Sequence, residues 1–242
     1  MSQSTRYSPL TVVLVHGAFA DGSSWAGVIE RLQANGTDAI AVANPLRGLT
    51  SDSAYVAGVL DGIPGPVLAV GHSYGGAVIT NAAAGRTNVV GLVFVGAFAP
   101  DEGEVLFDVT ATSNDAVLGP ALVQHQYDID GEVLTEFTID GAKTRDAFAA
   151  DLGETQAAVI AAVQRPVASS AFTDPSGPPA WRSLPCWAVV ATRDRAAGTD
   201  LVRAHAERAG AAITEVDGSH VIMISQPDAV TAVIESAIAK LS

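Results

Sequence analysis

Ser73 stands in the sequence Gly71-His72-Ser73-Tyr74-Gly75, with one glycine two residues away on each side. A serine hydroxyl is a weak nucleophile unless a neighbouring base takes its proton. Small apolar residues precede the pattern and an alanine-rich, helix-like segment follows it, so a strand is expected to turn sharply into a helix here. Such a turn has room only for small flanking residues, and it sets the hydroxyl at a helix N-terminus, which favours negative charge. We therefore predict that Ser73 is a nucleophile.

His220 is the histidine best placed to act as the base. It lies in the segment VDGSHVIMI, between the last predicted strand and the last predicted helix. In a doubly wound parallel sheet the loops that follow the strands share one edge, so His220 and Ser73 are expected to meet there. We expect His72 to pack and hydrogen-bond while it points away from Ser73, and His16 to brace the loop after the first strand. We expect His205 to lie on an exposed helix face and His125 to lie in the lid.

A catalytic histidine also needs a carboxylate that fixes its tautomer and stabilises the imidazolium. Asp194 directly follows the predicted strand that ends near Thr192, so it lies at the same edge as Ser73. Asp101, which follows the preceding strand, is a geometric alternative. Asp217 is too close in sequence to His220 to orient it and is interpreted as a turn residue.

Such a site also needs hydrogen-bond donors for an oxyanion and side chains that line a substrate pocket. The backbone N–H of Tyr74, just past the nucleophile, and that of Ala18, in the loop after the first strand, are the predicted donors. Phe19, Trp25 and Phe98, together with apolar lid residues, are candidates for the pocket wall, although each is also an ordinary core residue by type. A pocket of this kind favours a neutral, apolar substrate.

The elements that must position these residues follow from the hydrophobic pattern. Short runs rich in Val, Ile and Leu alternate with helix-like stretches, and continuous hydrophobicity is typical of strands buried on both faces. The predicted strands span 11–16, 38–43, 66–72, 89–96, 186–192 and 211–216, and the predicted helices 23–34, 52–61, 74–85, 199–209 and 227–240. This alternation predicts an α/β fold, a doubly wound and mostly parallel sheet with helices on both faces.

One interval is much longer than a single crossover needs. Residues 101–185 are therefore expected to form a lid over one edge of the sheet, with a helix over 142–164 and a short hairpin strand over 133–140. Residues 1–100 and 186–242 would then form the core of a single domain. Ser23 or Ser24 is expected to cap the first helix, and Pro227 to begin the last.

Composition limits the classes of function. The chain has 242 residues, is 48% hydrophobic and carries a net charge of −13, which disfavours nucleic acid and anionic membranes as partners. Its one cysteine, Cys186, lies in an apolar run and is expected to be a buried strand residue. The segment MSQSTRYSPL lacks the apolar core of a signal peptide, and no apolar run is long enough to span a membrane. We expect a soluble cytoplasmic protein without metal or cofactor, and a homodimer is compatible with the sequence.

Together these residues resemble the α/β-hydrolase superfamily, in which nucleophile, acid and histidine occur in the chain order of Ser73, Asp194 and His220. The segment HGAFADGSSW is similar to the branch that includes plant methyl-ester esterases, hydroxynitrile lyases and bacterial small-molecule esterases. This resemblance implies a Ser-His-Asp triad with Ala18 and Tyr74 as oxyanion donors.

Two departures from the lyases of that branch bear on the chemistry. Those lyases carry threonine where this chain has Gly17, and they use a lid lysine, whereas Lys143 here falls in a predicted helix and is expected to be solvated. The sequence therefore favours a serine hydrolase of small carboxylic esters or lactones. A lyase or C–C bond hydrolase using the same triad, and a slow ligand receptor on the same fold, are the alternatives.

Overall fold

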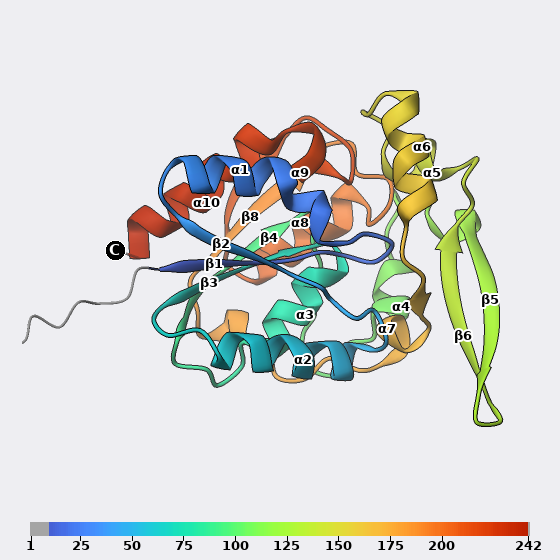
Figure 1. Cartoon of the computed structure of the whole chain (residues 1–242), viewed down its shortest axis with the longest axis horizontal. Helices are drawn as coiled ribbons and strands as arrows, with labels where there is room; N and C mark the ends of the chain where they lie inside the picture. The colour runs from blue at the N-terminus through green and yellow to red at the C-terminus, as the bar shows by residue number, and fades with distance from the viewer. Residues whose placement is uncertain (1–9, 242) are drawn as a thin grey trace, which may run out of the picture.

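A six-stranded parallel sheet forms the centre of the protein (Figure 1). The computed structural model describes residues 10–241. The strand order is β2-β1-β3-β4-β8-β9, so the chain begins one strand from the edge, adds β2 at that edge, and then returns to add β3, β4, β8 and β9 in the other direction. The six strands are β1 (Thr11–Val15), β2 (Asp38–Val42), β3 (Val67–His72), β4 (Val89–Val95), β8 (Cys186–Ala191) and β9 (Ala212–Val216).

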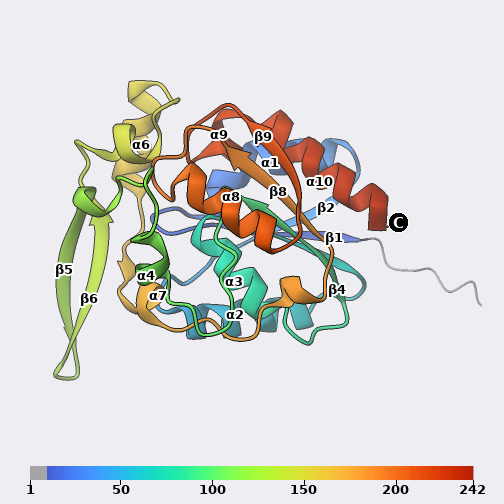
Figure 2. The same cartoon turned by 180° about the vertical axis from the view of Figure 1, so that it is seen from behind.

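The burial of each strand agrees with its place in this order. Every residue of β1, β3 and β8 is buried, as expected for strands covered on both faces, whereas β2 and β9 at the two edges expose part of their side chains. Helices α1 and α10 pack together on one face, α2 and α3 lie on the other, and α8 packs against β8 and β9 (Figures 1 and 2). Their bounds are η1 (Gly22–Trp25), α1 (Ala26–Ala34), α2 (Leu49–Asp61), α3 (Tyr74–Ala82), α8 (Thr199–Arg208), α9 (Ile222–Ser225) and α10 (Pro227–Leu241). The predicted doubly wound α/β fold is confirmed.

The long interval between β4 and β8 forms small elements that gather at the carboxyl ends of the strands (Figure 1). A second, three-stranded sheet in the order β5-β6-β7 belongs to this interval. The elements are α4 (Leu106–Thr110), η2 (Gly119–Ala121), β5 (Leu122–Ile129), β6 (Glu132–Ile139), α5 (Thr144–Phe148), α6 (Glu154–Val163), β7 (Val167–Ala168), α7 (Ser170–Thr173) and η3 (Ala180–Arg182).

Of two expectations for this interval, one is confirmed and one is corrected. The hairpin strand expected over 133–140 is β6, and it is joined to β5 by a two-residue turn in which Asp130 and Gly131 both have positive φ (54° and 86°), as a turn of this hand requires. The helix expected over 142–164 is broken between α5 and α6. Gly153 is extended at the N-cap of α6, and Asp151 turns towards the core instead of continuing a helix.

The start of the first helical segment also differs from the prediction. The carboxylate of Asp21 accepts a hydrogen bond from the backbone N–H of Ser23, so the capping residue is Asp21, and neither Ser23 nor Ser24 caps the segment. Pro227 does begin the last helix, and Cys186 is buried in β8, where burial raises the pKa of its thiol to about 12. Residues 1–9, which make up most of the segment MSQSTRYSPL, lie outside the described residues. Within residues 10–241 no helix is long and apolar enough to cross a membrane.

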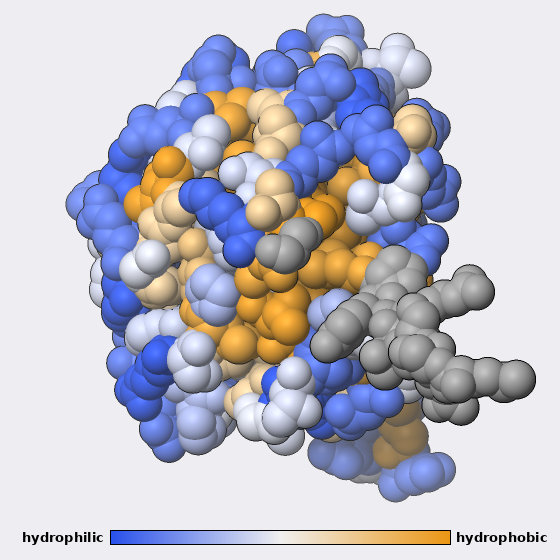
Figure 3. Space-filling model, turned by 90° about the vertical axis from the view of Figure 1, so that its left-hand side faces the viewer, coloured by the Kyte–Doolittle hydropathy of each residue, from blue (hydrophilic) through white to orange (hydrophobic). Residues whose placement is uncertain are grey.

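The edge at the amino ends of the strands has a different surface. Figure 3 shows hydrophobic side chains gathered in the middle of this face. Ile40 is 43% exposed there and, with Ile63 and Pro64, lines a shallow hollow of about 570 Å³. Asp38 is the one titratable side chain among the described residues that line the hollow. The hollow therefore offers no acid–base pair, unlike the opposite edge of the sheet.

His205 is buried, which corrects its assignment to an exposed helix face. It lies on the inner face of α8, where Nδ1 accepts a hydrogen bond from the backbone N–H of Ala99 at 3.0 Å and the ring packs against Phe98. Burial, followed by the positive charge of Arg208, lowers its pKa from 6.5 to about 4. The neutral form is therefore the one that the fold accommodates.

This histidine predicts a pH dependence of stability. Above pH 6.5 the imidazole is neutral in both folded and unfolded chains, and as the pH falls from 6.5 to about 4 only the unfolded chain gains the proton. The free energy of unfolding should fall by up to about 3 kcal/mol over that window from this residue alone. In His205→Asn, whose amide oxygen can still accept from Ala99, urea unfolding should show a flatter pH profile. The exposed His125→Asn is the control, and equal profiles for wild type and His205→Asn would refute the assignment.

Candidate active site

Ser73 occupies the sharp turn between β3 and α3. Its backbone has φ 52° and ψ −123°, a strained conformation for a residue with a side chain, which costs on the order of 1–3 kcal/mol. Backbone hydrogen bonds hold it there: the Ser73 N–H donates to Val95 O at 3.3 Å, and its carbonyl accepts from Gly76 and Phe98. Strain that the surrounding structure maintains in this way is typical of functional sites.

The glycines around Ser73 are required by close backbone contacts. A Cβ on Gly71 would lie 2.5 Å from the carbonyl oxygen of Gly75, and one on Gly75 would lie 2.3 Å from the carbonyl oxygen of Val15. Both distances are far below van der Waals contact. The turn therefore closes as tightly as it does only because these two positions lack side chains.

His220 and Asp194 come together from the loops after β9 and β8. Nδ1 of His220 lies 2.7 Å from Oδ2 of Asp194, and both residues are almost completely buried. The other carboxylate oxygen accepts the backbone N–H groups of Ala196 and Ala197 at 2.9 and 3.0 Å. With both its oxygens engaged, Asp194 holds the proton of His220 on Nδ1 and leaves Nε2 available as a base.

Asp101, the geometric alternative, is elsewhere. It forms an ion pair with Arg182 at the protein surface and has no contact with His220 in the structure. Asp217 likewise pairs with Arg193, at 2.8 Å and in an exposed position. Of these three acids, only Asp194 bonds His220.

His72 forms a hydrogen bond with His220 and packs against its ring. Its Nε2 donates to the carbonyl oxygen of His220 at 3.0 Å, and the centres of the two rings are 4.6 Å apart. Complete burial, together with the adjacent His220, lowers the pKa of His72 well below 6.5. His72 is therefore a neutral residue that packs and hydrogen-bonds, and it fixes the backbone of the histidine loop directly beside Ser73.

The loop after β1 passes against Ser73. His16 braces it, since Nδ1 donates to Gly17 O at 2.9 Å and Nε2 accepts from the Asn44 N–H at 3.1 Å, and burial lowers the pKa of this histidine. A Cβ on Gly17 would lie only 2.7 Å from Cβ of Ser73. Gly17 thus lets the loop that also carries Ala18 approach Ser73 closely.

The backbone N–H groups of Ala18 and Tyr74 are the candidates for an oxyanion site. Tyr74 is the first residue of α3, so its N–H has no partner within the helix. Among the described residues, neither N–H donates a hydrogen bond to the protein. A site with two free backbone donors, a strained serine and a histidine–carboxylate pair has the components for acyl transfer.

The sequence profile of the alpha/beta hydrolase family matches residues 12–233. The chain belongs to the alpha/beta hydrolase family. The superfamily expected from the motifs is therefore confirmed. A search of curated proteins by sequence gives no match.

Solved structures of several alpha/beta hydrolases share this architecture at low sequence identity. Polyneuridine aldehyde esterase is 17% identical with a TM-score of 0.81, covering 95% of this chain and 100% of its own. Tomato methylketone synthase I, complexed with 2-tridecanone, is 17% identical with a TM-score of 0.81, covering 98% and 100%. A pyrethroid hydrolase from Sphingobium faniae JZ-2 is 18% identical with a TM-score of 0.77, covering 96% and 98%. At these identities the likeness establishes the fold.

An aromatic side chain of the lid packs directly against His220 of this alpha/beta hydrolase. Phe148, from the lid helix α5, packs against the ring of His220 with centres 5.0 Å apart and edge-on against Phe19 at 6.3 Å. Sequence reasoning does not single out Phe148, because nothing in the stretch TRDAFAA distinguishes it from a core aromatic. The lid thus places an apolar ring directly against the candidate base.

The other two candidates for the pocket wall contact different neighbours. Trp25 is fully buried and packs edge-on against His72, with ring centres 6.4 Å apart. Phe98 packs against His205 at 6.1 Å. Of the three aromatics expected at the pocket, Phe19 is therefore the one that meets the lid beside His220.

A second lid residue missed from the sequence is Asp151. Its Oδ2 accepts the backbone N–H of Ser219 at 2.9 Å, and its Oδ1 accepts a short hydrogen bond from the Ser219 hydroxyl. Partial burial opposes ionisation, but these hydrogen bonds outweigh it and hold the pKa of the carboxyl below its usual value. Asp151 therefore ties the lid to the residue just before His220.

Removing this contact should affect turnover more than binding. In Asp151→Ala the loop that carries His220 loses two hydrogen bonds from the lid, so kcat for an ester substrate should fall several-fold while KM changes little. The free energy of unfolding should fall by about 1–3 kcal/mol. Steady-state kinetics and urea unfolding measure the two effects. Asp146→Ala, an exposed acid on α5, is the control, and unchanged kcat in Asp151→Ala would contradict the role.

The side chain of Tyr74 is engaged with Asp52 instead of with the candidate catalytic residues. Its hydroxyl donates to the buried carboxylate of Asp52 at 2.7 Å, and burial, with the charge of Asp52, raises the pKa of the phenol. The Asp52 carboxylate also accepts the backbone N–H of Arg47. These bonds anchor the start of α3, whose first N–H is one of the candidate oxyanion donors. Within residues 10–241, no group of three or more His, Cys, Asp or Glu side chains is arranged to hold a metal ion.

Proposed function

We propose that this alpha/beta hydrolase cleaves small, largely apolar carboxylic esters or lactones through an acyl-enzyme on Ser73. The observation that carries the proposal is the buried 2.7 Å contact between His220 Nδ1 and Asp194 at the strand edge where Ser73 is held in a strained turn. The chemistry of this arrangement is nucleophilic catalysis with a general base.

The first half of the reaction forms the acyl-enzyme. Oγ of Ser73 attacks the ester carbonyl carbon as Nε2 of His220 takes the hydroxyl proton. The carbonyl oxygen becomes an oxyanion, which the N–H groups of Ala18 and Tyr74 stabilise. The tetrahedral intermediate then collapses, the C–O bond to the alcohol breaks, and His220 returns its proton to the departing alkoxide.

The second half repeats these steps with water. His220 takes a proton from a water molecule, the resulting hydroxide attacks the acyl carbon, and Ser73 leaves with the proton that His220 returns. Throughout, Asp194 keeps the Nδ1 proton in place and stabilises the imidazolium. Phe19 and Phe148, which meet beside His220, are proposed to contact the substrate, so an apolar acyl or alcohol group is favoured.

The cyanohydrin-lyase alternative has less support. A threonine at position 17 would bring its Cβ to 2.7 Å from Ser73, so the loop of this chain fits glycine. Lys143 is exposed, and its Nζ donates to Pro120 O at the base of the hairpin. Neither of the two features expected of those lyases is therefore available here.

The test is turnover of p-nitrophenyl acetate and butyrate, with intact-mass detection of an acyl adduct. Release of nitrophenolate with an adduct of the acyl mass supports the proposal. A folded protein that forms no adduct and releases no nitrophenolate contradicts it. Assays with a cyanohydrin and a β-diketone, and thermal-shift screening of apolar ligands, would then separate a lyase, a C–C bond hydrolase and a receptor.

A further inference from the structure

Strand β5 is an open edge of the small sheet. It pairs with β6 on one side only, over all eight of its residues. In both views the β5–β6 hairpin stands at the periphery, with β5 on the side away from the core (Figures 1 and 2). Within residues 10–241, no hydrogen bond of the outward backbone groups of β5 to another segment is found. The strand is therefore free to accept a further strand.

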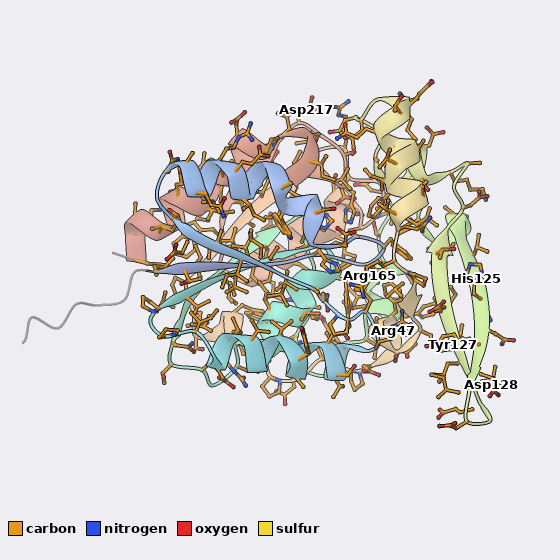
Figure 4. All side chains as sticks on the ribbon, in the orientation of Figure 1. Arg47, His125, Tyr127, Asp128, Arg165 and Asp217 are labelled. Carbon is orange, nitrogen blue, oxygen red and sulfur yellow. The ribbon has the colours of Figure 1, made fainter. Side chains whose placement is uncertain are left out.

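The hairpin is nevertheless held in place at the middle of its two strands. Nη1 of Arg47, an exposed residue between β2 and α2, donates to the hydroxyl of Tyr127 at 3.0 Å and pairs with Glu136 at 2.9 Å, and its Nη2 donates to Pro166 O (Figure 4). These bonds connect both strands of the hairpin to the loop before α2. The open edge is thus presented in one orientation, which reduces the entropic cost of pairing it.

From Leu122 to Tyr127 this edge lacks the features that usually protect such strands, and Asp128 near the tip is the one acidic or basic residue of the strand apart from His125. Proteins discourage edge pairing with lysine, proline or inward charges, and none of these occurs from Leu122 to Tyr127. Apolar side chains are exposed instead, with Val123 39% and Ile129 52% exposed on the face that also carries His125 and Tyr127. A long unprotected edge of this composition is typical of a strand that pairs with another chain.

Charges at the two ends of the hairpin are complementary. The tip carries Asp128, Asp130 and Glu132, and none of these forms an ion pair with a described residue. Lys143 lies at the opposite end, where its Nζ donates to Pro120 O at 2.9 Å and forms no ion pair within residues 10–241. An antiparallel partner of the same sequence would set the acidic tip of each hairpin beside the lysine of the other.

We propose that two copies of this chain associate by antiparallel pairing of their β5 strands, about a twofold axis at Gln126. In this register Val123 lies opposite Ile129 and His125 opposite Tyr127, so apolar and aromatic side chains meet on one face. Gln124 lies opposite Asp128, and Gln126 lies opposite its own copy. The two sheets become one continuous sheet of six strands.

This register also keeps the acidic tips of the two hairpins far apart. Asp130 of each copy faces Leu122 of the other, eight residues from the second Asp130, so the two tips are about 26 Å apart along the strands. That distance exceeds the screening length at physiological salt, about 8 Å. The same Asp130 lies near Pro120 of the other copy, whose carbonyl oxygen is bonded to Lys143, so the carboxylate is close to that ammonium group. In this register opposite charges are close together, whereas the like charges of the two tips are far apart.

Sedimentation velocity over a range of protein concentrations tests the proposal. The wild type should be a dimer. Gln126→Asp puts two carboxylates opposite each other on the axis and should raise the dimer Kd by roughly tenfold or more. Gln124→Lys is the matched control, since its ammonium would face Asp128 and should lower Kd. A wild type that remains monomeric at high-micromolar concentrations, or a dimer that Gln126→Asp leaves intact, would overturn the proposal.

Charge reversal separates loss of the contact from loss of folding. Lys143→Glu should weaken the dimer, Asp130→Lys should weaken it as well, and the two together should restore it. Far-ultraviolet circular dichroism and thermal unfolding monitor the fold of each variant. Restoration in the double variant supports the register, whereas additive weakening would assign the interface to another surface. The measurement needs no substrate, so its outcome is independent of the esterase proposal.

Discussion

Ser73→Ala is expected to reduce the hydrolysis of p-nitrophenyl butyrate by about 10⁴-fold or more and to abolish the acyl adduct. The alanine removes the only atom that the proposed mechanism bonds to the substrate and leaves the histidine–aspartate pair in place. Because the side-chain change is small and the turn is held by backbone hydrogen bonds, the thermal unfolding temperature should change little. Initial rates and intact mass spectrometry give the result.

A serine at the other end of the sheet serves as the control for this experiment. Ser183 lies just before β8, with its hydroxyl bonded to Ala180 O, and Ser183→Ala should retain full activity. Hydrolysis and adduct formation that persist in Ser73→Ala would move the nucleophile to another residue. Binding of apolar ligands retained in a folded Ser73→Ala would show that the pocket and the chemistry are separable.

The second large effect concerns the carboxylate. Asp194→Asn keeps an oxygen that can accept the N–H groups of Ala196 and Ala197, but its NH₂ group would face Nδ1 of His220. The imidazole must then carry its proton on Nε2, where it cannot act as a base. In a well-studied serine protease the same change lowers kcat by about 10⁴-fold, and a loss of that order is expected here.

Asp101→Asn is the matched control, because Asp101 is the geometric alternative and lies in an ion pair with Arg182 at the surface. It should leave kcat unchanged. Equal losses in both variants, or a loss in Asp101→Asn alone, would reject Asp194 as the orienting group. A pH–rate profile adds a second criterion, since Asp194→Asn should recover part of its activity at high pH, where hydroxide replaces the missing base.

The order of the main elements could be predicted because it depends on local signals. The six apolar runs form the six strands of the central sheet, with ends within a residue of those expected, because a short run of continuous hydrophobicity between turn residues is typical of a buried strand. The lid was harder. Its helices and strands are short and partly exposed, so the alanine-rich stretch over 142–164 did not reveal the break at Asp151, although the Asp130-Gly131 turn was a usable signal for the hairpin.

His205 shows where sequence reasoning fails for single residues. Its helix α8 is polar along most of its length, and a histidine there has no local feature that distinguishes an inner from an outer face. Only the packing of α8 against Phe98 and the N–H of Ala99 decides that it is buried and neutral. Burial of a polar side chain depends on a partner supplied by a distant segment, which the local sequence does not encode.

For the candidate site, the sequence by itself determined the tight turn around Ser73, because glycines at 71 and 75 and the strand-to-helix transition are local. It also determined that Asp194 and His220 follow strands and so lie at one edge of the sheet. Tertiary structure alone decided that Asp194, not Asp101, bonds His220, and that Phe148 and Asp151 of the lid contact the histidine loop. These contacts join segments far apart in the chain, and their geometry is set by how strands, helices and lid pack together.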